Sequence, residues 1–244
     1  MYYEYKEGKK RVNDILNSSL QIIEKDNIPS EDTFTFDNAY KCWVTSIFVD
    51  IRDSTTLFSN DKQVMVAKII KSFTSEIIEI LREGNTYNEI GIRGDCVYAV
   101  YSSPKQNDIS EIMDKVFWIN TLFKMLNKLF EQKGYETIKA GIGVSSAQEV
   151  IIKAGRKGTG INSKVWIGDA VTKASKLSSL SNKNNISPIA LSDCTYINMI
   201  DNLTKNNSDA PNWFTQVYDY KYGKYYHGDI IKSEFNEWIN GGMK

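Results

Sequence analysis

The sequence has little of the material on which several common active sites depend. It contains a single histidine, His227, and three cysteines, Cys42, Cys96 and Cys194, among 244 residues. One histidine leaves catalytic triads and multi-histidine metal sites without material. The cysteines are odd in number and form no Cys-x-x-Cys pair, so we expect buried small side chains rather than a disulfide framework or a zinc site.

Net charge and long apolar runs are also absent. Thirty basic residues balance thirty acidic residues, which argues against nucleic acid or an anionic membrane as a partner, because both require a basic surface. No apolar run approaches the roughly 20 residues that a membrane span needs, and the first residues do not read as a signal peptide. With 41% hydrophobic residues, we expect a globular, cytoplasmic protein with one core domain and terminal elaborations.

The chain is organised around residues 43–57. The first part is a short apolar run rich in β-branched and aromatic residues, which predicts a buried strand, and Asp50 follows where this run gives way to polar residues. Ser54 and Thr55 are good helix N-caps, and an amphipathic helix is expected over 57–81. An acid beside the free N–H groups of a helix start suits a metal-bound polyphosphate, so Ser54 and Thr55 are candidate substrate-binding residues.

The later pattern predicts a hairpin over 87–101 with its turn at Gly94 and Asp95, a helix over 109–132, and a strand over 137–145 with a hairpin partner over 149–154. The order strand, helix, strand, strand, helix, strand is that of the ferredoxin-like split βαβ arrangement. We therefore predict an α+β fold with an antiparallel-rich sheet and helices on one face.

Further elements are expected on both sides of this core. A helical pattern over 3–26 predicts that residues 1–40 form an N-terminal helix and linker. The core then spans 41–200. Residues 201–244 carry an aromatic hairpin and a short helix, which we expect to pack on the core.

Asp50 and Asp95 are the candidate metal ligands. In the predicted arrangement the first strand lies beside the hairpin, so the two carboxylates can converge on one point. Two acids, a backbone carbonyl and a triphosphate would complete the shell of Mg²⁺ or Mn²⁺, and two such ions could activate a hydroxyl and hold a leaving phosphate. The alternative is that Asp95 only makes a turn and Asp50 only caps the next helix. The order of elements favours the metal site.

Three short segments resemble the signature blocks of class III nucleotidyl cyclases. They are FVDIRDST at 48–55, RGD at 93–95 and WIGDAV at 166–171, and the resemblance covers roughly 43–193. It implies the catalytic-domain fold of that family, a head-to-tail homodimer with composite sites, and cyclisation of a nucleoside triphosphate by attack of the 3′-hydroxyl on the α-phosphate. It also implies that Asp50, the Ile51 carbonyl and Asp95 bind two Mn²⁺ or Mg²⁺ ions per site.

Four positions depart from the family pattern. Gly91 and Val165 stand where purine cyclases usually carry polar side chains that read the base, so purine recognition of the usual kind is absent. Thr172 replaces the Asn that usually orients the ribose, and Lys176 replaces the Arg that usually stabilises the charged transition state. Thr172 and Lys176 lie four residues apart on one predicted helix, hence on one face, and are the candidate catalytic residues. The alternative is that both are solvated surface residues.

The segment DIRDST at 50–55 is similar to the pyrimidine cyclases of bacterial Pycsar anti-phage systems. This resemblance implies cyclic UMP or cyclic CMP as an infection signal that a separate effector protein reads. A smaller base needs a tighter pocket, and Trp166, Tyr98 and Arg93 are candidates to narrow it or to donate hydrogen bonds to pyrimidine oxygens.

Arg93 has two interpretations. Strand alternation places it on the same face as Gly91, so its guanidinium could occupy the room that the missing side chain leaves. Alternatively, Arg93 pairs with Glu89 on the sheet. UTP is the first choice of substrate and CTP the second, because a donor such as Arg suits the carbonyl oxygens of uracil.

Three functions therefore remain open. The first is a pyrimidine nucleotide cyclase, the second is a purine cyclase with unusual base contacts, and the third is a catalytically silent dimer that senses nucleotides. The presence of both Asp50 and Asp95 argues against the silent dimer, because an inert site has no use for two clustered acids.

Overall fold

The computed structural model describes residues 2–54 and 62–244. Its central element is the long strand β2 (Asn38–Ile51). This strand runs antiparallel to β4 (Cys96–Ser102) on one side and to β5 (Ala140–Gly155) on the other, and β3 (Tyr87–Arg93) pairs with β4. The order β3-β4-β2-β5 is that of a ferredoxin-like split βαβ unit, so the predicted fold is confirmed.

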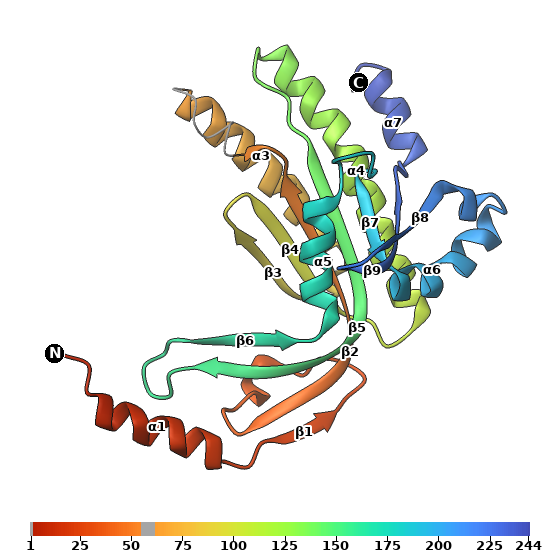
Figure 1. Cartoon of the computed structure of the whole chain (residues 1–244). Helices are drawn as coiled ribbons and strands as arrows, with labels where there is room; N and C mark the ends of the chain where they lie inside the picture. The colour runs from red at the N-terminus through yellow and green to blue at the C-terminus, as the bar shows by residue number, and fades with distance from the viewer. Residues whose placement is uncertain (1, 55–61) are drawn as a thin grey trace.

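Further strands extend this sheet within the described residues. The strands β7 (Ile189–Ser192), β9 (Gly223–Gly228) and β8 (Phe214–Asp219) follow β5 in that order. Two more strands lie at the other end of the long pair: β1 (Gln21–Glu24) beside β2 and β6 (Asn162–Ile167) beside β5. Figure 1 shows the result, a sheet whose lower part is formed by the long strands and by β6 and β1.

Helices lie on both sides of the sheet. The two long helices, α3 (Gln63–Arg82) and α4 (Gln106–Gln132), pack on alternate apolar residues of β2 such as Ile47 and Val49. The helices α6 (Asp193–Asn206) and α7 (Ser233–Asn240) contact α4. The shorter helix α5 (Asp169–Leu180) lies against β5 and β2 on the opposite face (Figure 1). The two long helices thus cover one face of the sheet as expected. The helix α5 covers part of the other face, where it contacts β2 and β5.

Two glycines of β5 allow α5 to approach the sheet closely. A Cβ atom at Gly143 would lie 2.0 Å from the carbonyl oxygen of Ala174, and one at Gly141 would lie 2.3 Å from that of Ser178. Any side chain at these positions would push the helix away. Because Gly141 lies opposite Asp50 in the strand register, the glycines bring the last turns of α5 next to the end of β2.

Two element predictions are wrong. The helix expected over 3–26 is α1 (Tyr5–Asn17), which ends at the extended residue Ser18. The chain then forms β1, because the free edge of β2 offers its backbone groups as partners from Asn38 onward.

The second wrong prediction is the hairpin between 137–145 and 149–154. Residues 140–154 belong instead to the single strand β5, because β2 is long enough to pair with it from Ala39↔Ile152 to Ile51↔Ala140. The hairpin partner of β5 is β6 instead.

The helix expected over 57–81 is described only from α3 onward, and residues 57–61 lie outside the described residues. No helix within 2–54 and 62–244 is both long and apolar enough to cross a lipid bilayer.

Candidate active site

The end of β2 and the β3–β4 turn bring Asp50 and Asp95 together. Asp50 lies opposite Cys96 in the antiparallel register, and Asp95 directly precedes Cys96 in the turn. Both acids are partly exposed. The Cys96 thiol lies close to both carboxylates: burial and then the charges of Asp50 and Asp95 raise the pKa of Cys96 to about 12. The structure therefore brings an acid at the end of a strand and an acid in a hairpin turn close together.

The pKa of Asp50 is raised above its ordinary value by burial and in part by the negative charge of Asp95. Burial raises the pKa of Asp50, Arg52 lowers it, Asp95 raises it again, and Lys183 lowers it. Two carboxylates side by side repel each other when both are ionised. A divalent cation between them would remove this repulsion.

The donor set fits a hard cation. Asp50 and Asp95 supply carboxylate oxygens, and the hydrocarbon side chain of Ile51 has no donor atom, so only its backbone carbonyl could serve as a ligand. Within the described residues no group of three or more His, Cys, Asp or Glu side chains is placed to hold a metal ion. Mg²⁺ and Mn²⁺ commonly take a few carboxylates, water and substrate phosphates rather than a complete protein cage. The acid pair suits a metal ion whose remaining ligands are water or the phosphates of a triphosphate.

Arg52 connects this acid pair with α5. Its side chain is only 3% exposed. The guanidinium donates to the carboxylate of Asp50 at 2.5 Å, to the carbonyl oxygen of Asp50 at 2.9 and 3.2 Å, and to the carbonyl oxygen of Ser179 at 2.9 Å. Ser179 belongs to the last turn of α5. One buried cation therefore holds both a candidate metal ligand and a helix end.

Thr172 and Lys176 are exposed on α5, one turn apart. Within residues 2–54 and 62–244, neither makes a hydrogen bond or an ion pair through its side chain. The start of this helix is fixed by Glu149 of β5, whose buried carboxylate accepts the backbone N–H groups of Ala170 and Val171. Burial raises the pKa of Glu149. The helix is thus held at both ends while its candidate catalytic face stays open.

The room beside Gly91 is filled by Tyr98 and not by Arg93. A Cβ atom at Gly91 would lie 2.5 Å from the Tyr98 ring. This ring stacks on Phe48 with centroids 5.2 Å apart, and its hydroxyl donates to Glu89 at 2.7 Å.

Arg93 is exposed at the end of β3. The suggested filling of the gap by its guanidinium is therefore wrong, because the larger ring from the neighbouring strand already occupies it. The acid that Arg93 was expected to pair with accepts the Tyr98 hydroxyl instead.

Val165 and Trp166 lie far along the sheet from Gly91. Val165 is 41% exposed on β6 and lies opposite Ile152, which lies opposite Ala39 at the start of β2. Gly91 lies opposite Tyr98, which faces Phe48 near the end of β2.

Trp166 packs against the buried cluster that includes Tyr40 and Val44. Its indole N–H is buried without a partner among the described residues. The register of one chain therefore places Gly91 and Val165 at different ends of β2.

Ser54 is partly exposed just after β2, and Thr55 lies outside the described residues. The structure also places Arg52 and Lys183 near Asp50, and the sequence analysis singled out neither of them as a site residue. Arg52 stands inside the first signature segment, which was a usable signal. Lys183 lies in an Asn-rich turn 131 positions after Arg52, and no pattern points to it.

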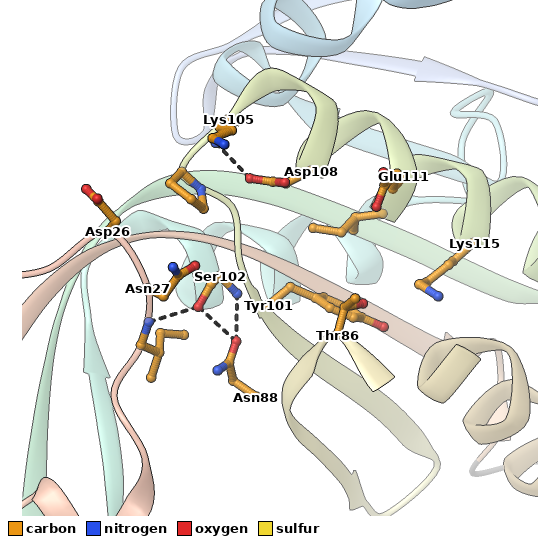
Figure 2. Close-up of a pocket in the computed structure, with 13 residues that line it drawn as sticks. Asp26, Asn27, Thr86, Asn88, Tyr101, Ser102, Lys105, Asp108, Glu111 and Lys115 are labelled. Atoms are coloured by element: carbon orange, nitrogen blue, oxygen red, sulfur yellow. Dashed lines mark hydrogen bonds between the residues drawn. The ribbon is translucent and has the colours of Figure 1, made fainter. Parts of the chain in front are cut away.

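A separate hollow of about 620 Å³ lies between the β1–β2 connection, the base of the β3–β4 hairpin and the start of α4. Figure 2 shows its polar wall, in which Ser102 accepts from the backbone N–H of Ile28 and contacts Asn88. None of the predicted site residues lines it. The acid pair and this hollow are therefore different places.

The acid pair, the fold and the signature segments identify the class of protein. Residues 38–206 match the family described as the adenylate and guanylate cyclase catalytic domain, and the chain belongs to this family. Solved structures of the fold agree. The adenylyl cyclase CyaB from P. aeruginosa is 17% identical with a TM-score of 0.62, covering 80% of this chain and 97% of that chain.

A class III adenylyl cyclase-like ATP-binding protein from Pseudomonas aeruginosa has a TM-score of 0.68 at 16% identity, covering 96% of this chain and 48% of that chain. Two relatives are more specific. A uridylate cyclase from Treponema porcinum is 50% identical over 243 residues, which is 100% of this chain and 83% of the relative. A uridylate cyclase from Gulbenkiania mobilis is 29% identical over 246 residues, covering 97% of this chain and 95% of the relative.

Proposed function

We propose that this protein converts UTP to 3′,5′-cyclic UMP and pyrophosphate. The observation that carries the proposal is the acid pair of Asp50 and Asp95 next to a base position, Gly91, that lacks a polar reader and is filled by Tyr98. The 50% identical relative from Treponema porcinum is named a uridylate cyclase. That match runs along the whole chain and supports the same base choice here.

The reaction forms one bond and breaks one. The 3′-oxygen of UTP joins the α-phosphorus, the bond from that phosphorus to pyrophosphate breaks, and the 3′-hydroxyl proton passes to solvent. Asp50, Asp95 and the Ile51 carbonyl would hold two Mn²⁺ or Mg²⁺ ions, which supply activation of the hydroxyl and neutralisation of the triphosphate. Catalytic domains of this family generally use divalent metal ions.

Lys176 and Thr172 act on the α-phosphate and on the ribose of the substrate. Lys176 offers positive charge to the α-phosphate oxygens as the new bond forms, and the Thr172 hydroxyl orients the ribose. Lysine is a point charge and lacks the two-point hydrogen bonding of arginine, so we expect stabilisation through charge more than through geometry. The open face of α5 leaves both side chains accessible to a nucleotide.

We further propose that each site forms between two chains arranged head to tail. The different ends of β2 at which Gly91 and Val165 lie, and the unpartnered face of α5, support a site that one chain does not complete. The second chain would supply the missing side. Similarity to the Pycsar cyclases supports a role for cyclic UMP as an anti-phage signal in the cytoplasm, read by a separate effector protein.

The test is to incubate the purified protein with Mn²⁺ and each of UTP, CTP, ATP and GTP separately, and to identify the products by mass. We expect cyclic UMP from UTP and much less product from the other three. Cyclic CMP as the main product would make the protein a cytidylate cyclase. Cyclic AMP or cyclic GMP would show a purine cyclase, and no product from any nucleotide would favour a silent nucleotide-sensing dimer.

A further inference from the structure

Arg52 is a buried cation. Its side chain is almost fully buried at the junction of β2 and α5, and its only acidic partner is Asp50 among the described residues. The other two acceptors are backbone carbonyls, of Asp50 itself and of Ser179. The guanidinium is therefore held at several points, and it cannot rotate away without losing all of them.

The contacts divide the oxygens of Asp50 into two groups. Arg52 takes Oδ2 and the main-chain carbonyl. Within the described residues, no hydrogen bond reaches Oδ1, and the carboxylate of Asp95 lies on the side of the β3–β4 turn. The Asp50 side chain is 26% exposed. A fixed guanidinium on one oxygen thus leaves the other free for a cation shared with Asp95.

The second contact of Arg52 satisfies the end of α5. The last carbonyls of a helix have no partner inside the helix, and a positive charge there is favourable. No basic residue stands in the last turn of α5 itself. Arg52 fills this place from β2, so the end of the helix and the carboxylate of Asp50 are positioned by the same group.

We propose that Arg52 is a positioning residue that orients the Asp50 carboxylate for the divalent cation and ties this orientation to the last turn of α5. Groups that hydrogen-bond a metal ligand usually change metal affinity about 10–100-fold when they are removed. The inference rests on the metal role proposed for Asp50 and goes beyond it, because the residue assigned here does not touch the metal.

The experiment measures Mn²⁺ binding to the full-length protein by isothermal titration calorimetry, without nucleotide. The variants are Arg52→Lys, which keeps the charge but not the fork of donors, and Arg52→Gln, which removes the charge. The matched control is Arg82→Lys on α3, whose side chain is 55% exposed and, among the described residues, pairs only with Glu79 at 3.5 Å. We expect Mn²⁺ affinity to fall about tenfold or more in Arg52→Lys, at least as much in Arg52→Gln, and not in the control.

A second readout follows the helix end. Amide hydrogen exchange over 177–181 should become faster in both Arg52 variants than in the wild type and in Arg82→Lys, since the carbonyl of Ser179 loses its donor. A folded Arg52→Lys protein with wild-type Mn²⁺ affinity would overturn the proposal. So would failure of both variants to fold, because Arg52 would then serve the stability of the fold.

The outcomes separate this inference from the proposed function. A wild-type protein that binds Mn²⁺ through Arg52-dependent contacts and makes no cyclic nucleotide would refute the cyclase and keep the role of Arg52. If the wild type makes cyclic UMP and the Arg52 variants bind Mn²⁺ as tightly as the wild type, the cyclase is kept and the role of Arg52 is refuted.

Discussion

Asp50 lies between opposing influences at the end of β2. Burial and the neighbouring Asp95 favour its protonated form, while Arg52 favours its charged form. A metal ion would favour the charged form of Asp50, as Arg52 does, and Asp95 would then serve as a second ligand. Each acid is thus expected to matter through its charge.

Replacing either acid by its uncharged isostere should abolish catalysis. For Asp50→Asn and for Asp95→Asn we expect turnover of UTP to fall at least about 100-fold, because the metal ions lose a charged ligand. Product formation measured by mass spectrometry checks this. Asp14→Asn on the exposed surface of α1 is the control and should keep full activity. Full activity in either active-site variant would contradict the metal assignment.

His227 is the residue whose titration should be visible in stability. Burial lowers the pKa of His227, and the backbone N–H of Ser187 donates to its Nδ1 at 3.1 Å, so the neutral ring carries its proton on Nε2. The unfolded chain therefore binds a proton more readily than the folded one. The stability that this residue contributes is complete above its unfolded pKa of about 6.5 and is lost as the pH falls below it.

Urea unfolding at pH 7.5 and pH 5.5 tests this expectation. The wild type should lose more stability between the two values than His227→Gln, by at most about 1.4 kcal/mol per pH unit. Other groups titrate in both proteins, so the difference between them isolates the histidine. Equal losses in the two proteins would contradict the buried neutral ring.

The helix α5 is held at both ends and still exposes its candidate catalytic face. Glu149 fixes its first turn, Arg52 fixes its last turn, and Gly141 and Gly143 let it lie directly on β5. All these contacts use backbone groups of the helix. Its exposed side chains are therefore free to act on a substrate.

Lys176 should contribute to the rate more than to binding. For Lys176→Met we expect kcat to fall by about 10²–10³ with a smaller change in KM, because the charge acts on the developing transition state. Steady-state kinetics with UTP provides the measurement. Lys205→Met, on the exposed surface of α6, should stay close to the wild type. Lys176→Arg should retain activity, and a large loss there would argue against a role based on charge.

At the scale of the whole molecule, β2 separates the predicted parts of the site. The acid pair lies at its C-terminal end, and Val165 is joined through Ile152 to its N-terminal end. A second chain placed head to tail would bring the two parts together. Oligomeric closure of this kind requires the same surfaces on both chains.

Mixing two inactive variants tests whether the sites are composite. Asp50→Asn and Lys176→Met should each be inactive, and equal amounts allowed to exchange subunits should recover about a quarter of wild-type activity, since half of the dimers then contain one intact site. Activity after mixing is compared with that of each variant alone. No recovery, with exchange of subunits verified by mass, would place both residues of a working site on one chain.

Much of the fold could be predicted because it depends on local patterns. The apolar run before Asp50, the Gly94–Asp95 turn and the two long helices have clear periods and punctuation. The two wrong element predictions have one cause, which is that the sequence pattern of a segment does not indicate how long its partner strand is. β5 continues through a predicted turn, and residues 21–24 leave the helical pattern, because β2 offers partners along its whole length.

The candidate site divides in the same way. The two acids follow from their order and spacing in the sequence, and the approach of Asp50 to Asp95 follows from the predicted order of strands. The residues at 91, 165, 172 and 176 follow from the resemblance to the cyclase family. The occupant of the gap beside Gly91 does not, because the competing side chains of Arg93 and Tyr98 come from neighbouring strands.

The sequence by itself determined the family, the fold and the absence of a polar purine reader, since these depend on residue identity and order. Only the tertiary structure decided that Tyr98 fills the room beside Gly91 and that Arg52 joins Asp50 to the end of α5. The physical reason is that burial and hydrogen bonding depend on which residues meet in space. Ser179 and Arg52 lie 127 positions apart and meet only because two glycines admit α5 to the sheet.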